Sequence, residues 1–317
     1  MKINSMLKII DLPTIKSILP KADLINEIEK GFVAYSKGEV IVPPVGELSF
    51  DSPPGDVHIK YGYIKNDSIY VVKIASGFYQ NSSIGLPTGN GMIIIFDKQS
   101  GKPIAVLNDE CYLTDVRTAI AGAICAKYLA PKNIKNIGII GTGIQARMQL
   151  EYLKDVIDCK KIMVWGRNPE SVIKYQNEMN ESGFVVSTAT NIDEVIDNSQ
   201  LIVTCTASEN PLINSVKQGT HITAMGSDTI SKQELHSSVL FDADLIVSDS
   251  FSQSRERGEI HHALNDDLPF NRVIELGEII LGKKEGRTND AQITVADLTG
   301  VAVQDIQIAK VVLDNLE

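Results

Sequence analysis

A glycine-rich turn between an apolar strand and a helix is the most informative feature of the sequence. The segment Gly141-Thr142-Gly143-Ile144-Gln145-Ala146 follows Ile137-Gly-Ile-Ile140 and opens a stretch with helical spacing. The first glycine permits a tight turn, and the second lets a pyrophosphate approach the backbone, while the alanine keeps helix and strand close. We therefore predict that these six residues bind a dinucleotide, although a tight turn without a ligand has the same local pattern.

The surrounding chain alternates strands and helices. From residue 136 onward, the runs NIGIIG, KIMVWG, FVVST, QLIVTCT, HITAMG and LIVSDS read as strands separated by helical segments, which predicts a parallel sheet covered on both faces. Residues 41–107 form short β-rich runs broken by turns, typical of an antiparallel sheet. An Ala-rich helix is expected after Asp115, ending before Pro131, and an amphipathic helix over 300–317. The predicted fold class is α/β, with a Rossmann-type sheet and a smaller α+β domain.

Length and composition narrow the function classes. A chain of 317 residues with a net charge of −10 fits two domains and disfavours binding to nucleic acid or to an anionic membrane. No signal-peptide pattern and no run of 18–20 apolar residues is evident, so a cytoplasmic location is expected. The four cysteines lack C-x-x-C spacing, which favours free thiols. His261 and His262 would point about 100° apart on a helix, so we predict no metal site.

The end of the strand after the glycine turn bears on the choice of cofactor. NAD sites usually carry an Asp or Glu there, which accepts a hydrogen bond from the ribose 2′-hydroxyl. This sequence instead reads Val164-Trp-Gly-Arg167, and a guanidinium could pair with a 2′-phosphate. The strand end therefore favours NADPH over NADH, unless Arg167 is a solvated turn residue.

Several blocks together resemble the ornithine cyclodeaminase/mu-crystallin family. These are GLPTGNGMIIIFD, LTDVRTAIAGAICAKYLAP, GIIGTGIQARMQL, MGSDTISKQELH and DLTGVAVQD. The resemblance, closest to the Δ1-pyrroline-2-carboxylate (ketimine) reductase branch, implies a homodimer. It further implies a substrate-binding and dimerisation domain over 1–117 plus 300–317 and a Rossmann domain over 118–299.

Three polar residues in apolar contexts are the predicted catalytic residues. Hydride transfer at an imine needs a cation for the carboxylate and an acid or base near the nitrogen. By the resemblance, Lys73 contacts substrate, Arg117 grips its carboxylate and Asp228 is the acid/base. Each has an alternative: Lys73 as an outward-facing strand residue, Arg117 as a partner of Asp115, and Asp228 as the N-cap of a helix starting near residue 231.

The sequence departs from the family where many members carry an arginine after paired prolines. Val45 stands there, so Lys60 is a candidate substrate-binding residue in its place, sharing a strand face with His58. A solvated polar face explains that pair equally well. Further cofactor-binding candidates are the hydroxyl residues Thr204, Thr206 and Ser208 after one strand and Ser227 after the next, which could equally be cap or turn residues.

The predicted function is an NAD(P)H-dependent reductase of a small ketimine carboxylate, with Δ1-pyrroline-2-carboxylate to L-proline as the first substrate to test. The partners expected are a small imino or amino acid and a second copy of the chain. Alternatives are ornithine cyclodeaminase with retained NAD, alanine dehydrogenase, and a mu-crystallin-like protein that binds NADPH without turnover. Val45 and Arg167 weigh against the cyclodeaminase, and the presence of Asp228 against the non-catalytic protein.

Overall fold

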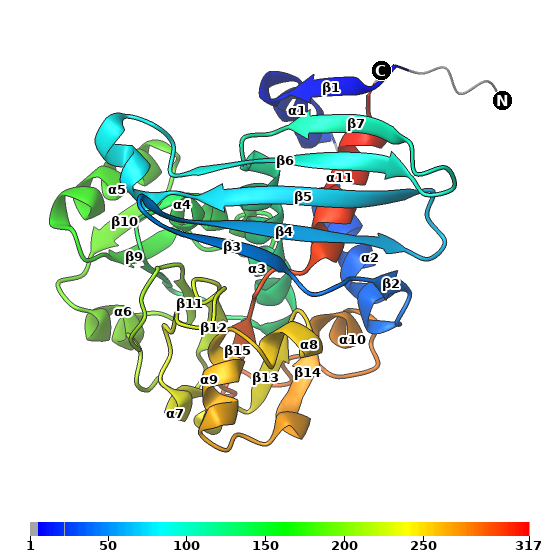
Figure 1. The fold of residues 1–317 in the computed structure, drawn as a ribbon. Coiled ribbons are helices and arrows are strands. Elements are labelled where there is room, and N and C mark those ends of the chain that lie inside the picture. The colour runs from blue at the N-terminus through cyan, green and yellow to red at the C-terminus, as the bar shows by residue number, and fades with distance from the viewer. Residues whose placement is uncertain (1–5, 22, 317) are drawn as a thin grey trace. The chain divides into compact units, whose positions relative to one another are not determined.

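The computed structural model describes residues 6–21 and 23–316, which divide into two compact units (Figure 1). The first unit contains the described residues up to Arg117 together with those from Val301 onward. The second runs from Thr118 to Gly300. One long helix, α3 (Tyr112–Leu129), belongs to both, because the boundary falls within it. Segments from both sides of residues 118–300 in the sequence therefore build one unit, and the chain between them forms the Rossmann-type unit.

The first unit is built on a mixed sheet. Its described strands follow the order β1-β7-β6-β5-β4-β2, and β3 also pairs with β4. Only the β1–β7 pairing in this described sheet is parallel. The strands are β1 (Lys8–Asp11), β2 (Val40–Ile41), β3 (Gly46–Asp51), β4 (Pro54–Ile64), β5 (Ile69–Gly77), β6 (Gly89–Asp97) and β7 (Pro103–Asn108). The helices are α1 (Leu12–Ile18), α2 (Leu24–Ser36) and α11 (Ala302–Asp314), with short 3₁₀ turns at Leu19–Lys21 and Tyr79–Ile84.

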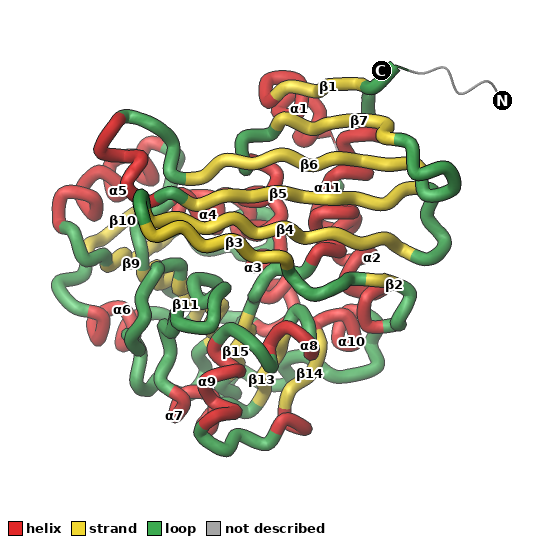
Figure 2. The backbone as a smooth tube through the Cα atoms, in the orientation of Figure 1, coloured by secondary structure: helices red, strands yellow, loops and turns green. Residues whose placement is uncertain are grey.

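The two faces of this sheet differ in their environment. On β5 the side chains of Val71 and Lys73 are buried on the inner face of the sheet. Helix α11 crosses the strands on this face (Figure 2). Ile93 and Ile95 of β6 are fully buried on that same face. The sequence predicts an amphipathic helix over 300–317, but nearly all residues of α11 from Ala302 to Val312 are buried. The helix is packed between the sheet and α2, so a one-sided apolar pattern is not what its position requires.

The second unit holds an entirely parallel sheet of eight described strands, in the order β10-β9-β8-β11-β12-β15-β13-β14. The strands are β8 (Ile137–Ile140), β9 (Lys161–Trp165), β10 (Val185–Thr188), β11 (Leu201–Thr204), β12 (His221–Ala224), β13 (Leu245–Ser248), β14 (Val273–Glu275) and β15 (Thr294–Asp297). The helices are α4 (Ile144–Leu153), α5 (Pro169–Glu181), α6 (Ile192–Asn198), α7 (Ser237–Asp242), α8 (Phe251–Ser254), α9 (Glu259–Asn265) and α10 (Leu276–Ile280), with a 3₁₀ turn at Phe270–Arg272.

The predicted α/β fold with a Rossmann-type sheet is confirmed. Each residue of β8, β11, β12, β13 and β15 is buried, as expected for central strands covered by helices on both faces. The chain order reverses at β8, whose neighbours are β9 and β11. Ligands of open α/β sheets bind at the carboxyl ends of the strands at such a switch point. This topology directs attention to the loops after β8, β9 and β11.

Two observations bear on the predictions from composition. In the ranges that the structure describes, no helix combines the length and apolar character needed to cross a membrane. The four cysteines are free thiols, and Cys125 is the buried one of the set.

Candidate functional site

A buried cluster of charges forms the polar centre of the first unit. Lys73 of β5 is 2% exposed, and its Nζ lies 3.0 Å from Oδ1 of Asp305 on α11. Arg117 of α3 is 4% exposed, and its Nε donates to the same oxygen at 2.9 Å. The outward-facing alternative for Lys73 is therefore wrong, because α11 covers that face of the sheet. Oδ1 of Asp305 thus contacts both Lys73 and Arg117, the two cations that are predicted to bind the substrate carboxylate.

The location of Arg117 differs in detail from the expectation. The helix begins at Tyr112 rather than after Asp115, which places Arg117 in its second turn. The guanidinium also donates from Nη1 to Oε1 of Gln304 at 3.2 Å. Two consecutive residues of α11 therefore orient Arg117, and both lie in the DLTGVAVQD block.

Lys60 joins this cluster from the neighbouring strand. It lies directly opposite Lys73 in the β4–β5 register and is 7% exposed. A solvated face is therefore wrong for Lys60, although His58 is partly exposed. Burial alone would raise the pKa of Asp305, but the charges of Lys73, Arg117 and Lys60 outweigh it and hold that pKa below its ordinary value. The cluster keeps a carboxylate ionised in a buried position.

A second buried carboxyl, Asp109, was not predicted from sequence. Its Oδ2 accepts a hydrogen bond from the Leu113 amide at 2.9 Å, at the start of α3. Burial raises its pKa to about 6. The next two residues, Glu110 and Cys111, have φ of 53° and 71°, which is unusual for side-chain-bearing residues. Burial raises the pKa of the Cys111 thiol to about 11, so this thiol stays protonated near neutral pH.

In the second unit, the glycine turn has the geometry of a dinucleotide loop. Gly141 has φ of +125°, and a Cβ there would lie 2.8 Å from the carbonyl oxygen of Cys205. Gly143 is the N-cap of α4, and a Cβ built on it would meet no protein atom within 4 Å. The first glycine is thus required by the protein itself, whereas the second leaves open space at a helix N-terminus, where phosphates bind.

The remaining residues of the turn are placed by the helix that they open. Ala146 is fully buried, and its carbonyl accepts a hydrogen bond from the Tyr175 hydroxyl at 2.8 Å. Ile144 is 56% exposed in the first turn of α4, and Gln145 follows it. Sequence reasoning missed Arg147, whose Nη1 donates to the carbonyls of Thr142 at 2.5 Å and of Gly143 at 3.0 Å. These bonds fix the carbonyl side of the turn.

A cavity of about 320 Å³ lies at the carboxyl ends of β8, β9 and β11. Its lining consists of Gly141, Thr142, Gly143, Trp165, Gly166, Arg167, Asn168, Cys205, Thr206, Ala207, Ser208 and Leu212. These loops flank the switch point of the sheet, so the cavity has the position and the lining that a dinucleotide requires. Arg167 is exposed at its edge, and Asn168 caps α5 by accepting from the Ser171 amide at 3.0 Å.

The hydroxyl candidates are divided between the cavity and the interior. Thr204 is fully buried, and its hydroxyl donates to Oε2 of Glu234 at 2.7 Å. Thr206 lines the cavity while its hydroxyl donates to Oε1 of Glu234, also at 2.7 Å. Glu234 itself, which sequence reasoning missed, is fully buried and also accepts from the Gly226 amide at 2.9 Å. It ties together the loops that follow β11 and β12.

Asp228 lies on the loop after β12. No helix starts near residue 231 in the described chain, so the N-cap interpretation is wrong. Instead, Asp228 Oδ1 lies 2.7 Å from Nζ of Lys232, and its side chain is 41% exposed. The hydroxyl of the neighbouring Ser227, buried in the loop, donates to the Lys232 carbonyl. The predicted acid/base is therefore a partly exposed carboxylate on the loop after β12.

Over residues 6–21 and 23–316, no group of three His, Cys, Asp or Glu side chains could hold a metal ion. The rings of His261 and His262 are inclined at 68°, and each contacts a different carbonyl: that of Arg255 for His261 and that of Lys232 for His262. The two histidines of α9 thus have different hydrogen-bond partners.

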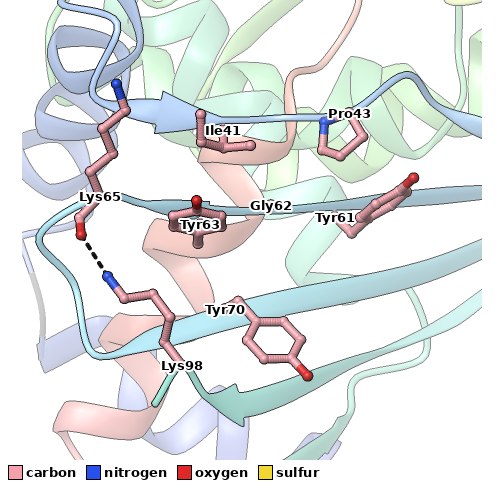
Figure 3. Close-up of a pocket in the computed structure, with 8 residues that line it drawn as sticks. All are labelled: Ile41, Pro43, Tyr61, Gly62, Tyr63, Lys65, Tyr70 and Lys98. Atoms are coloured by element: carbon pink, nitrogen blue, oxygen red, sulfur yellow. Dashed lines mark hydrogen bonds between the residues drawn. The ribbon is translucent and has the colours of Figure 1, made fainter. Parts of the chain in front are cut away.

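A broad hollow lies on the outer face of the first unit's sheet (Figure 3). Its lining is Ile41, Pro43, Tyr61, Gly62, Tyr63, Lys65, Tyr70 and Lys98. Lys98 lies 5.4 Å from the ring centroid of Tyr63 and donates to the Lys65 carbonyl at 2.6 Å. The register places further apolar side chains on this face, including Leu48 at 54% exposure and Met92 at 38%. The face is apolar, aromatic and exposed in this chain.

The sequence matches the ornithine cyclodeaminase/mu-crystallin family over residues 7–317. An ornithine cyclodeaminase of Brucella abortus is 33% identical over 85% of this chain and 76% of its own length. An archaeal alanine dehydrogenase dimer with bound NAD superposes with a TM-score of 0.90 and 33% identity, covering 98% of this chain and 95% of that one. The Δ1-pyrroline-2-carboxylate reductase of Thermococcus litoralis, in complex with NADH and L-proline, has a TM-score of 0.90 and 27% identity, with coverage of 98% and 97%.

Proposed function

The chain belongs to the ornithine cyclodeaminase/mu-crystallin family, and within it we propose a reductase that uses NAD(P)H to reduce a small ketimine carboxylate. Members of the family are NAD(P)-dependent reductases and cyclodeaminases that act on imino or amino acids, so this protein is an NAD(P)-dependent enzyme of the same kind. The observation that best supports the proposal is that Lys73 and Arg117 are both buried and both form ion pairs with Asp305. Δ1-Pyrroline-2-carboxylate, giving L-proline, is the first substrate to test.

In the proposed mechanism, the first unit holds the carboxylate. A guanidinium can grip a carboxylate with two parallel hydrogen bonds, and Nε of Arg117 is already oriented by Asp305. The ammonium of Lys73 supplies a second positive charge beside it. Both cations are held by protein contacts, so little conformational entropy remains to be lost when a substrate binds.

Asp228 is the proposed proton donor at the substrate nitrogen, directly or through a water. It is accessible, and Lys232 pairs with it at 2.7 Å. A positioned acid or base of this type contributes about 10²–10⁴-fold to a rate. Lys73, Arg117 and Asp228 are the proposed catalytic residues.

The proposed cofactor site is the turn from Gly141 to Ala146 together with the cavity that reaches Arg167. A reduced nicotinamide supplies the hydride for the imine carbon. Structural neighbours with bound NAD or NADH support a nicotinamide cofactor. The exposed guanidinium of Arg167 at the cavity edge supports NADPH over NADH, because it could pair with a 2′-phosphate.

We further propose that the protein is a homodimer that pairs through the outer face of the first unit's sheet. Exposed apolar patches of this kind mark interaction surfaces in soluble proteins. Leu48, Tyr61 and Met92 all point to that face, and the hollow of Figure 3 lies on it. The archaeal alanine dehydrogenase, which is a dimer, supports a dimeric assembly.

The test is oxidation of NADPH, and of NADH in parallel, at 340 nm with Δ1-pyrroline-2-carboxylate. Rapid oxidation that falls about 100-fold or more in Asp228→Ala and Arg117→Ala is expected. Glu285→Ala, a change at an exposed position, serves as the control. Ammonia and proline formed from ornithine with catalytic NAD would instead identify a cyclodeaminase, and ammonia-dependent reduction of pyruvate an alanine dehydrogenase. Tight NADPH binding without any turnover would contradict the enzyme proposal.

A further inference from the structure

The buried side chain of Glu234 connects the wall of the cofactor cavity to the loop that carries Asp228. Each of its two carboxylate oxygens accepts two hydrogen bonds. Oε1 accepts from the amide and the hydroxyl of Thr206, at 2.6 Å and 2.7 Å. Oε2 accepts from the hydroxyl of Thr204 at 2.7 Å and from the amide of Gly226 at 2.9 Å. One side chain therefore holds the chain where it leaves two neighbouring strands, β11 and β12.

The backbone of Glu234 is fixed as well. Its amide donates to Oε1 of Glu259 on α9 at 2.8 Å, and Oε2 of Glu259 accepts from the Leu235 amide at 2.9 Å. The Glu234 carbonyl accepts from the amides of Leu212 and Ile213, at 2.7 Å and 3.1 Å. Because its amide, carbonyl and carboxylate are all hydrogen-bonded, Glu234 has little freedom to move. The groups that it binds are therefore held in one geometry.

The hydrogen bonds require a carboxylate at this position. Each oxygen of Glu234 accepts from one backbone amide, and a backbone amide can only donate. A glutamine in either orientation would therefore place its NH₂ group against the amide of Thr206 or that of Gly226. Burial disfavours the ionised form and raises the pKa of Glu234, while the hydrogen bonds oppose that rise. The chain thus keeps a costly buried acid where the two loops meet.

These contacts bear on both halves of the proposed reaction. Thr206 lines the cofactor cavity, and Gly226 lies two residues before Asp228. We propose that Glu234 is a positioning residue, which fixes the wall of the cofactor cavity and the Asp228 loop relative to one another. A misplacement of reacting groups by about 1 Å can lower a rate about 100-fold, so such a link matters for catalysis. This inference rests on the proposed reductase, in which Asp228 donates the proton.

The kinetic test is a double-mutant cycle in the full-length protein, with NAD(P)H and Δ1-pyrroline-2-carboxylate. Glu234→Gln should lower kcat about 10- to 100-fold. The KM for the imino acid should change by less than about threefold, because Lys73 and Arg117 are untouched. In an Asp228→Asn background, Glu234→Gln should lower kcat by less than about threefold, because the group that it positions is already lost. A purely structural role would not produce this dependence on Asp228.

Two further variants make the test specific. Glu194→Gln is the matched control, because Glu194 on α6 also accepts from the amide and the hydroxyl of a threonine, Thr190, both at 2.8 Å, but does not line the cavity. It should leave kcat and cofactor binding unchanged. Thr204→Val is the milder variant for the case in which Glu234→Gln does not fold. It removes one buried donor to Glu234 and should lower kcat about 3- to 10-fold, again only when Asp228 is present.

A binding measurement separates this inference from the proposed reductase activity. In fluorescence titration, the Kd for NAD(P)H should rise about tenfold in Glu234→Gln, because Thr206 in the cavity wall loses its partner. If folded Glu234→Gln keeps the wild-type kcat, or if its loss and that of Asp228→Asn simply multiply, the positioning inference is overturned and the reductase stands. If the wild type turns over no imino or amino acid, the reductase proposal fails. The Kd then decides: the rise in Glu234→Gln supports the Glu234 inference, and an unchanged value overturns it.

Discussion

Arg117 donates from Nε to Oδ1 of Asp305 across 2.9 Å, although the two residues are 188 positions apart in the chain. Lys73 reaches the same oxygen at 3.0 Å. This oxygen is the point at which strand β5, the long helix α3 and the C-terminal helix α11 meet. The C-terminal helix is thus part of the proposed carboxylate site as well as of the core.

Removing the charge of Asp305 should destabilise the fold. In Asp305→Asn, Lys73 and Arg117 lose a buried counter-ion, and breaking a buried pair from one side costs about 3–5 kcal/mol. Urea denaturation should show a drop of that order in the free energy of unfolding. The matched control is Asp197→Asn. The side chains of Asp197 and Lys217 are 60% and 61% exposed, so their ion pair should contribute less than about 1 kcal/mol to stability. Equal effects of the two changes would contradict the central role of Asp305.

The two glycines of the turn should separate folding from cofactor binding. Gly143 has an ordinary φ of −81°, and a Cβ added there would meet no protein atom within 4 Å. The fold should therefore tolerate Gly143→Ala, while the Kd for NAD(P)H should rise about 100-fold or more. Gly141 has φ of +125°, and a Cβ added there would lie 2.8 Å from the carbonyl oxygen of Cys205. Gly141→Ala should therefore lower the free energy of unfolding by about 2 kcal/mol or more. Fluorescence titration and urea denaturation measure the two effects. Unchanged binding in Gly143→Ala would refute the assignment of the turn.

Arg167 should set the choice between the two nicotinamide cofactors. Replacing it by Ala removes a charged partner for the 2′-phosphate, so the preference for NADPH over NADH should fall roughly 10- to 100-fold. The ratio of the two dissociation constants is the quantity to compare. Lys174→Ala on α5, at 74% side-chain exposure, removes a nearby positive charge and should leave the ratio intact. A wild-type preference for NADH would make the interpretation of Arg167 wrong.

Asp297 should make the protein less stable as pH rises. Burial raises its pKa from 3.8 to about 7, so between these values the folded state binds a proton that the unfolded state has released. The free energy of unfolding should therefore fall by about 4 kcal/mol across this window. Asp297→Asn should gain that amount over the wild type between pH 4 and pH 8 in urea denaturation. Asp242→Asn, at an exposed position, should follow the wild-type curve; parallel curves for all three proteins would refute the prediction.

A charge on the outer sheet face should prevent dimerisation. Met92→Glu places a carboxylate on an apolar surface, and its burial in an interface would be costly without a partner. Light scattering should give a monomer of about 35 kDa, in line with a chain mass of 34.6 kDa, where the wild type gives twice that value. Ile173→Glu on α5 is a similar change at 56% exposure and should leave the dimer intact. A monomeric wild type would overturn the proposed assembly.

Features that depend on residues close together in the chain could be predicted from the sequence. The glycine turn could be identified because the strand before it, the two glycines and the helix after it are contiguous and each has a local physical requirement. The same holds for the parallel sheet, since its fully apolar strands and intervening helices appear in order along the chain. The family resemblance further directed attention to Lys73, Arg117 and Asp228.

The directions of the polar side chains, and the groups that compensate their charges, depend on how distant parts of the chain pack together. Strand alternation allows either face for Lys73, and the packing of α11 made that face the interior. Local propensity allowed an N-cap at Asp228, whereas the chain continues there as a loop and Asp228 pairs with Lys232. Asp305 was missed because its partners are distant in sequence, and a buried charge gains its counter-ions only when strands and helices from both ends of the chain pack together.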